Sequence, residues 1–136
     1  MSEPFASFAT EIEVLKQVYA AINRNDIPAA VALLHPEIER IEPPGFPTSG
    51  TYRGRTEVTA HLSNGRNTWA EGTCEPERFL ASGDKVIVFL HVRVRLKDHT
   101  EWIDAHIADV YTFRDGHPIQ MRTFANQQDA LRDGPL

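Results

Sequence analysis

Apolar and polar residues alternate with a period of two along residues 86–113, which is the most regular pattern in the chain. In the first arm, Val or Leu occupies every second position from Val86 to Leu96. The second arm begins after a short polar segment at residues 97–100. Alternation of this kind predicts β-strands with one buried face. We therefore expect two long antiparallel strands joined by a tight turn at residues 97–100.

Folding the two arms about Asp98 and His99 predicts which residues pair across the hairpin. Opposite charges, and a cation over an indole ring, are favourable cross-strand pairs, and a slip of one residue would set the apolar row of one arm against the polar row of the other. Both faces of the hairpin therefore support one register. Its apolar face pairs Val94 with Ile103, Val92 with Ala105, Leu90 with Ile107 and Val88 with Asp109, and its other face pairs Arg95 with Trp102, Arg93 with Asp104 and His91 with His106.

Asp109 is the exception on the apolar face. In this register it lies among Val88, Leu90 and Ile107, where a lone carboxylate is costly unless it is hydrogen-bonded or neutral. Such an environment favours a role as general acid or oxyanion donor. A structural carboxylate paired with Arg122 on the neighbouring strand is the alternative, because ion pairs also perturb buried acids.

The rest of the pattern predicts helices first and further strands afterwards. Apolar residues recur at helical spacing over residues 8–23, where Thr10 is a candidate cap unless the helix starts earlier. Asp26 and Thr56 are candidate caps of two further short helices. Strands are expected at residues 38–42, 73–81 and 119–126, followed by a polar tail with room for one helical turn. This order predicts an α+β fold, in which a long twisted sheet wraps its apolar face around the first helices and leaves a pocket between them.

Composition narrows the class of protein. The 136 residues fit a single domain spanning residues 1–136, and the 41% hydrophobic and 24% charged content is ordinary for a soluble globular protein. A net charge of −5 without a basic run argues against nucleic acid or an anionic membrane as partner. One cysteine excludes an internal disulfide and a cysteine metal cluster. With no signal peptide and no apolar run near the roughly 20 residues that span a bilayer, we expect a cytoplasmic protein.

Three stretches resemble a known family. They are residues 18–26 (VYAAINRND), residues 31–34 (VALL) leading to Ile41-Glu42-Pro43, and residues 109–113 (DVYTF) followed by residues 119–122 (IQMR). In order and spacing, the chain resembles the nuclear transport factor two-like superfamily, on the branch of SnoaL-like polyketide cyclases and ketosteroid isomerases. The resemblance implies a cystatin-like α+β barrel, whose cone-shaped, strongly curved and mostly antiparallel mixed sheet wraps around three N-terminal helices and a central pocket. It also implies a homodimer formed through the outer face of the sheet.

The resemblance assigns two candidate catalytic carboxyls. Glu42, just before Pro43, falls where ketosteroid isomerases have their general base, and Asp109 falls where they have a protonated aspartic acid that donates to the substrate oxyanion. Their oxyanion tyrosine on the first helix corresponds to Val18, and Tyr19 projects about 100° away around the helix. For Glu42, the alternative is a solvated glutamate at the end of a strand.

Further residues are predicted to line the pocket. With the parity that we assign to the last strand, Arg122, Phe124 and Asn126 face inward, where Arg122 can bind a carboxylate or enolate and Asn126 can orient a ligand. A surface arginine and a strand-end cap are the alternatives, and the polar groups argue against a steroid substrate. The remaining candidates are apolar or aromatic side chains that can equally belong to the core, namely Phe46, Tyr52, Trp69, Val18, Val88 and Leu90.

The histidines do not predict a metal centre. Two of them are neighbours on the outer face beside one carboxylate, which gives two imidazole ligands at most. We interpret the large amphipathic groups of this face as a homodimer interface, and we expect no cofactor. The residues of this face are His91, Arg93, Arg95, Trp102, Asp104 and His106.

Two classes of function remain open. The first is a small cofactor-independent acid–base enzyme of the isomerase, cyclase or hydrolase type, acting on a carbonyl-containing, polycyclic or terpenoid-like metabolite. An acid–arginine–acid set formed by Glu42, Arg122 and Asp109 would suit epoxide hydrolysis. The second is a non-catalytic ligand-binding or dimerisation module of the same fold. An open pocket shared by Glu42 and Asp109 favours the enzyme, and a closed interior favours the module.

Overall fold

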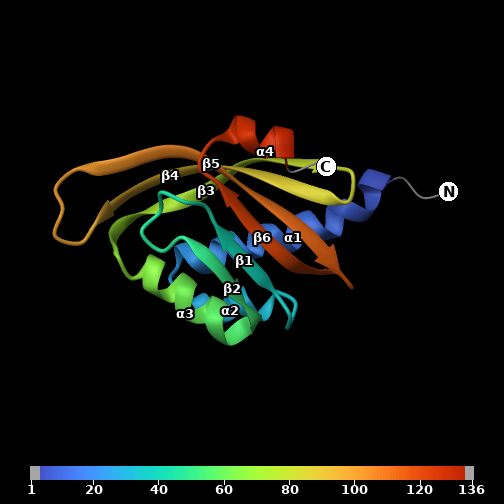
Figure 1. Ribbon diagram of the computed structural model, residues 1–136, viewed down its shortest axis with the longest axis horizontal. Helices are drawn as coiled ribbons and strands as arrows, with labels where there is room; N and C mark the ends of the chain where they lie inside the picture. The colour runs from blue at the N-terminus through green and yellow to red at the C-terminus, as the bar shows by residue number, and fades with distance from the viewer. Residues whose placement is uncertain (1–3, 134–136) are drawn as a thin grey trace.

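The computed structural model describes residues 4–133, which form four helices and a six-stranded mixed sheet (Figure 1). This confirms the predicted α+β class. None of the helices in this range is long and apolar enough to cross a membrane. In chain order the elements are α1 (Pro4–Asn23), α2 (Ile27–Ala32), β1 (Glu39–Glu42), β2 (Gly50–Arg53), α3 (Gly54–Arg66), β3 (Trp69–Ser82), β4 (Lys85–Leu96), β5 (Trp102–Arg114), β6 (His117–Phe124) and α4 (Gln127–Asp133).

The strands lie in the order β2-β1-β6-β5-β4-β3. All neighbours are antiparallel except β1 and β6, which run parallel. The three longest strands, β3, β4 and β5, form a continuous antiparallel meander that curves around α1 (Figure 1). The short strands β1 and β2 extend this sheet beyond β6, so that residues early in the chain lie beside its last strand.

The central hairpin has the predicted register at every pair. Val88 lies opposite Asp109 on β4 and β5, and His91 lies opposite His106. Asp98 turns the chain with a φ of 64°, a left-handed conformation that aspartate tolerates better than most residues. The alternation of side chains therefore predicts the pairing of the two hairpin arms correctly.

The two faces of the sheet are both partly covered. On the inner face, residues such as Val88, Leu90 and Tyr111 pack against α1, α2 and α3. On the outer face, Phe89 and Val110 belong to a second buried cluster that includes Ala130 of α4. In Figure 1, α4 lies on the side of the sheet away from α2 and α3. The buried apolar cluster of the outer face thus includes a residue of the helix that covers it, α4.

Several predicted boundaries differ from the structure. The side chain of Asp26 caps α2 as expected, accepting a hydrogen bond from the Ala29 backbone N–H at 3.2 Å. The caps predicted at Thr10 and Thr56 are wrong, because α1 begins at Pro4 and α3 begins at Gly54. Strand β2 was missed, since a four-residue exposed edge strand has almost no hydrophobic alternation to detect.

Gly72 provides a test of the register between β3 and β4. It lies opposite Val94 with a φ of +119°, and a Cβ added there would approach the Val94 Cα to 2.5 Å. We expect Gly72→Ala to lower the free energy of unfolding by about 2–3 kcal/mol, because both the backbone conformation and the close strand contact oppose a side chain. Urea unfolding of the full chain measures this difference.

Gly65→Ala is the matched control. Gly65 lies in α3, and a Cβ there would meet nothing within 4 Å. This change should leave stability unchanged or raise it by up to about 1 kcal/mol, because alanine favours the helix. Equal unfolding midpoints for the Gly72 and Gly65 variants would contradict the described register.

Candidate active site

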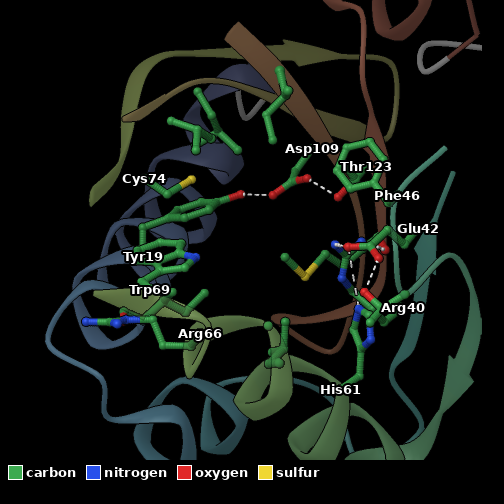
Figure 2. Close-up of a pocket in the computed structure, with 18 residues that line it drawn as sticks. Tyr19, Arg40, Glu42, Phe46, His61, Arg66, Trp69, Cys74, Asp109 and Thr123 are labelled. Carbon is green, nitrogen blue, oxygen red and sulfur yellow. Dashed lines mark hydrogen bonds and ion pairs between the residues drawn. The ribbon is translucent and has the colours of Figure 1, made fainter. Parts of the chain in front are cut away.

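A cavity of about 230 Å³ lies between the inner face of the sheet and the helices. Figure 2 shows Tyr19 and Trp69 on one side of this space, Glu42 and Phe46 on the other, and Asp109 beside Thr123 at one end. Both candidate carboxyls therefore line one cavity. Its apolar wall is formed by Ile22, Leu62, Leu90, Val92, Ile107 and Met121.

Asp109 is buried and fully hydrogen-bonded. The residue is 3% exposed, as its position on the apolar face of the hairpin predicts. The Tyr19 hydroxyl donates to Oδ2 at 2.5 Å, and the Thr123 hydroxyl donates to Oδ1 at 2.5 Å. Thr123 lies directly opposite Asp109 across β5 and β6. These two donors offset the desolvation of the carboxyl group.

The hydroxyl of Tyr111 extends this network. It lies 2.7 Å from the Tyr19 hydroxyl. Because the single Tyr19 proton is directed at Asp109, Tyr111 must be the donor in this contact. Burial, followed by the charge of Asp109, raises the pKa of both tyrosines well above the ordinary phenol value. Both phenols therefore keep their protons and act as hydrogen-bond donors.

Tyr19, and not Val18, brings α1 into the site. The resemblance places Val18 at the position of the oxyanion tyrosine, and Tyr19 projects about 100° away from it around the helix. In the structure Val18 is packed in the core at 1% exposure, and Tyr19 lines the cavity. A hydroxyl at the end of a long side chain reaches Asp109 from the neighbouring helical position.

Glu42 forms a second polar cluster at the end of β1. Thr48 donates a hydrogen bond to Oε1 at 2.5 Å. Arg40 Nη2 lies 3.4 Å from Oε2, and His61 Nε2 of α3 lies 3.7 Å from the same oxygen (Figure 2). The side chain of Glu42 is 11% exposed, so it is not the solvated strand-end glutamate that was the alternative.

These neighbours determine the charge of Glu42. Burial alone would raise its pKa, but the interactions with His61, Thr48 and Arg40 outweigh that effect and lower the pKa below its ordinary value. The carboxylate is therefore ionised at neutral pH. It is held in place by three side chains from different parts of the chain.

Arg40 and His61 were not predicted as site residues. Arg40 is 5% exposed, and it donates from Nη1 to the Ile41 carbonyl at 2.8 Å and to the Met121 carbonyl at 3.4 Å. Within the described residues its Nε has no hydrogen-bond partner. The sequence contained a signal for Arg40, because it is two residues before Glu42 and shares its face of the strand. It contained no such signal for His61, which lies on a mostly polar helix.

The predicted parity of the last strand is wrong. Thr123 shares the inner face with Asp109, so Met121 and Thr123 line the cavity. Arg122 is exposed, with its guanidinium carbon 4.8 Å from the centre of the Phe124 ring. Arg122 therefore neither pairs with Asp109 nor binds in the cavity. A one-residue error in parity moves every side chain to the other face.

Phe124 and Asn126 are corrected by the same observation. Phe124 belongs to the outer cluster beneath α4. Asn126 lies beyond the end of β6, and its Oδ1 accepts from the Gln128 backbone N–H at 2.7 Å. The alternative interpretation of Asn126, as a cap, is the one that fits the structure.

The remaining candidates divide between cavity and core. Phe46, Trp69 and Leu90 line the cavity. The ring of Tyr52 stacks on that of His61, with ring centres 3.9 Å apart. Val88 is packed in the core. These two do not line the cavity.

Cys74 also lines the cavity. Burial, followed by the charge of Asp109, raises the pKa of its thiol well above the ordinary value. The thiol is therefore held protonated and packs as a small apolar side chain.

Comparison with known proteins identifies the fold family. A family model described as the SnoaL-like domain matches residues 15–120. Curated proteins gave no match. TerC, solved after co-crystallisation with polyporic acid, is 23% identical, with 90% of this chain and 96% of that chain covered and a TM-score of 0.76.

Two further solved structures have the same architecture. A nuclear transport factor two-like protein from Burkholderia pseudomallei is 22% identical over 93% of this chain and 98% of that chain, with a TM-score of 0.77. A hypothetical protein from Catenulispora acidiphila with a ketosteroid isomerase-like fold, solved in complex with trimethylamine, is 13% identical over 91% of this chain and 93% of that chain, with a TM-score of 0.74. At these identities the likeness shows the fold alone.

The lowered pKa of Glu42 predicts an acid-dependent contribution to stability. Because the pKa is lower in the folded chain than in the unfolded chain, the contribution is present above the unfolded value of about 4.3 and is lost as pH falls through the folded value. Urea unfolding should be measured from about pH 7 to about pH 3, which spans the range in which carboxyl groups titrate. Over this range the free energy of unfolding of the wild type should fall toward that of Glu42→Gln. Glu101→Gln, at an exposed position, is the control, and its free energy of unfolding should vary with pH as that of the wild type does. Parallel curves for wild type and Glu42→Gln would contradict this role.

Proposed function

The chain belongs to the SnoaL-like domain family, and we propose that it is a cofactor-independent enzyme that transfers protons on a small carbonyl-containing metabolite. The main support is the convergence of two carboxyls, Glu42 and Asp109, on one largely apolar cavity. An apolar cavity with a few convergent polar groups is the usual setting of a small-molecule site. Isomerisation and aldol-type cyclisation both require this arrangement of base and acid.

Glu42 is the general base in this proposal. Thr48, Arg40 and His61 fix the position of its carboxylate, which is the first requirement of a base. Its lowered pKa makes it a weak base, so the substrate must have a comparatively acidic C–H bond. We therefore favour a carbon acid whose enolate is delocalised over a second carbonyl group or an unsaturated system.

Asp109 and Tyr19 are the hydrogen-bond donors to the substrate oxygen in this proposal. Tyr19 retains its proton, and its hydroxyl lies at the cavity wall. When Asp109 carries a proton, it no longer needs both hydroxyl donors, and the Tyr19 hydroxyl is free to turn to a developing oxyanion. The guanidinium of Arg40 adds positive charge to the same cavity. With Arg40 in place of Arg122, the acid–arginine–acid composition suited to epoxide opening is also present.

A binding module is the second candidate function. All four oxygens of the two carboxyls already have protein partners, from Thr48, Arg40 and His61 at Glu42 and from Tyr19 and Thr123 at Asp109. Such saturation favours a cavity that holds a ligand without reacting with it. The two functions differ in whether a bound carbonyl compound exchanges its protons with solvent.

Deuterium exchange tests the catalytic proposal. We expect the protein to catalyse solvent exchange at the activated carbon of a β-keto ester or of 2-tetralone, followed by proton NMR. Glu42→Gln and Asp109→Asn should each lower the rate by about 100-fold or more, as loss of a general acid or base does. Arg114→Gln, at an exposed position outside the cavity, is the control.

Two results would contradict this proposal. If these probes bind but do not exchange, the cavity is a binding module. If they exchange equally fast in Glu42→Gln and Asp109→Asn, the assigned residues are wrong. Circular dichroism of each variant verifies that the fold is intact.

We also propose that two copies of the chain pair through the part of the outer face that α4 leaves uncovered. Trp102 is 39% exposed there, and the Arg93 guanidinium carbon lies 4.3 Å from the centre of its ring. Large aromatic and arginine side chains are enriched at such interfaces, and a two-fold contact uses the same patch twice. The proposed interface consists of His91, Arg93, Arg95, Trp102, Asp104 and His106.

Light scattering of the full chain tests this pairing. We expect a dimer at micromolar concentration, and Trp102→Glu should shift it toward the monomer because a buried aromatic anchor is replaced by a charge. Glu101→Gln, next in the chain and also exposed, should leave the mass unchanged. A wild-type monomer at that concentration would rule out the pairing.

A further inference from the structure

The guanidinium of Arg40 has a hydrogen-bond donor that the protein itself does not use. Nη1 donates to the Ile41 carbonyl at 2.8 Å and to the Met121 carbonyl at 3.4 Å, and Nη2 faces Glu42. Among residues 4–133, no group accepts a hydrogen bond from Nε, although this nitrogen is buried. A buried donor without an acceptor is costly. Because Arg40 lines the cavity, an oxygen atom inside the cavity can supply the missing acceptor.

The pairing of Arg40 with Glu42 is loose. Nη2 and Oε2 are 3.4 Å apart, whereas a strong hydrogen bond between a guanidinium and a carboxylate is about 2.7–2.9 Å long. Arg40 cannot follow Glu42, since the two carbonyl contacts of Nη1 hold it against β1 and β6. The two side chains are only 7% and 11% exposed, so solvent screens their charges weakly. The positive charge of Arg40 is therefore only partly satisfied by Glu42.

We propose that Arg40 is a catalytic residue that binds an enolate oxygen of the substrate, and that the substrate has two carbonyl groups that share one enolate. This inference rests on the proposed function, because it assigns a place to the second oxygen of the delocalised enolate described there. One oxygen lies at Arg40 beside Glu42, and the other lies at Tyr19 and Asp109. Figure 2 shows Arg40 and Glu42 together on the side of the cavity opposite Tyr19. Each end of the delocalised anion thus has its own donors.

Transfer of one proton moves the negative charge from the protein to the substrate. The Glu42 carboxylate takes the proton from the carbon, and the electron pair of the broken C–H bond moves onto the carbonyl oxygen. Glu42 becomes neutral as the enolate becomes negative, so the net charge beside Arg40 is unchanged. The guanidinium then pairs with the enolate oxygen through Nε and the second hydrogen of Nη2. When Glu42 returns the proton to another carbon of the enolate, the original pairing is restored.

This exchange of partners favours the transition state over the bound substrate. A donor that is fixed before the reaction, and that interacts most strongly with the developing charge, lowers the barrier. Burial raises the pKa of Glu42, but His61, Thr48 and Arg40 together lower it. The charge of Arg40 that weakens Glu42 as a base also stabilises the enolate, so it makes the C–H bond of the bound substrate more acidic.

Binding of 4-nitrophenolate to the full chain tests the inference without requiring turnover. This flat anion carries oxygen at both ends and resembles a delocalised enolate, and 4-nitrotoluene is a neutral molecule of nearly the same shape. At a pH at which the phenol is ionised, calorimetry should show that Glu42→Gln binds the anion at least about tenfold more tightly than wild type, because a nearby like charge is removed. Arg40→Gln should bind it at least about tenfold more weakly. The affinity for 4-nitrotoluene should change little in either variant.

Arg55→Gln is the matched control. Arg55 lies on α3 and donates to the Leu34 carbonyl at 2.5 Å, and it is not among the residues that line the cavity. This variant removes an arginine that binds a backbone carbonyl, and it should bind both probes as wild type does. Circular dichroism verifies that each variant is folded. If Arg40→Gln does not fold, the comparison of Glu42→Gln with wild type decides.

Three results would overturn the inference. The first is equal or absent binding of 4-nitrophenolate in wild type and Glu42→Gln. The second is an unchanged affinity for this anion in folded Arg40→Gln. The third is an equal loss of affinity for both probes in Arg40→Gln, which would mark a structural role only.

The outcome is separate from that of deuterium exchange. Exchange at a β-keto ester without this pattern of anion binding would keep the proposed function and overturn the assignment of Arg40. The same pattern of anion binding without exchange would support Arg40 as the oxygen contact of a binding module and overturn its catalytic role.

Discussion

The hydrogen bonds to the buried carboxyl of Asp109 are the constraint on which the inner face of the molecule depends. A carboxylate in an apolar interior is tolerated only when each oxygen finds a donor. Tyr19 supplies one donor from α1, and Thr123 supplies the other from β6. One buried carboxyl group therefore fixes the rotation of α1, the parity of β6 and the alignment of both with β5. The Tyr111 hydroxyl, on the same strand as Asp109, completes the chain of donors.

The second polar cluster places a different set of elements. Glu42 joins its own strand β1 to α3 through His61 and to the loop before β2 through Thr48. Arg40 also reaches the Met121 carbonyl, at the seam where β1 runs parallel to β6. The cavity lies between these two clusters, so the same hydrogen bonds that position the strands also position the candidate catalytic groups. Removing either cluster would alter the fold and the site together.

The accuracy of sequence-based prediction follows from how many faces of each element are buried. The hairpin was predicted to the residue because its distal half has one apolar face and one polar face, and Asp109 was noticed as an exception to that rule. The parity of the last strand was predicted wrongly because α4 covers its outer face, so that Met121 and Phe124 are both buried although they lie on opposite faces. Burial on both sides removes the period of two. The same effect on α1 hid the choice between Val18 and Tyr19, since both are enclosed.

The two buried polar clusters are better explained by chemistry than by stability. Replacing a buried ion pair by well-packed apolar residues is often neutral or stabilising, so a network of charges does not by itself make a fold more stable. Here Arg40, Glu42 and His61 form one network and Tyr19, Asp109 and Thr123 form another, and members of both line the same cavity. A purely structural interior of this size would be expected to be filled by apolar side chains at native packing density. The open space between the two networks gives their hydrogen bonds a role that packing alone does not require, and this supports a site for an oxygen-bearing ligand.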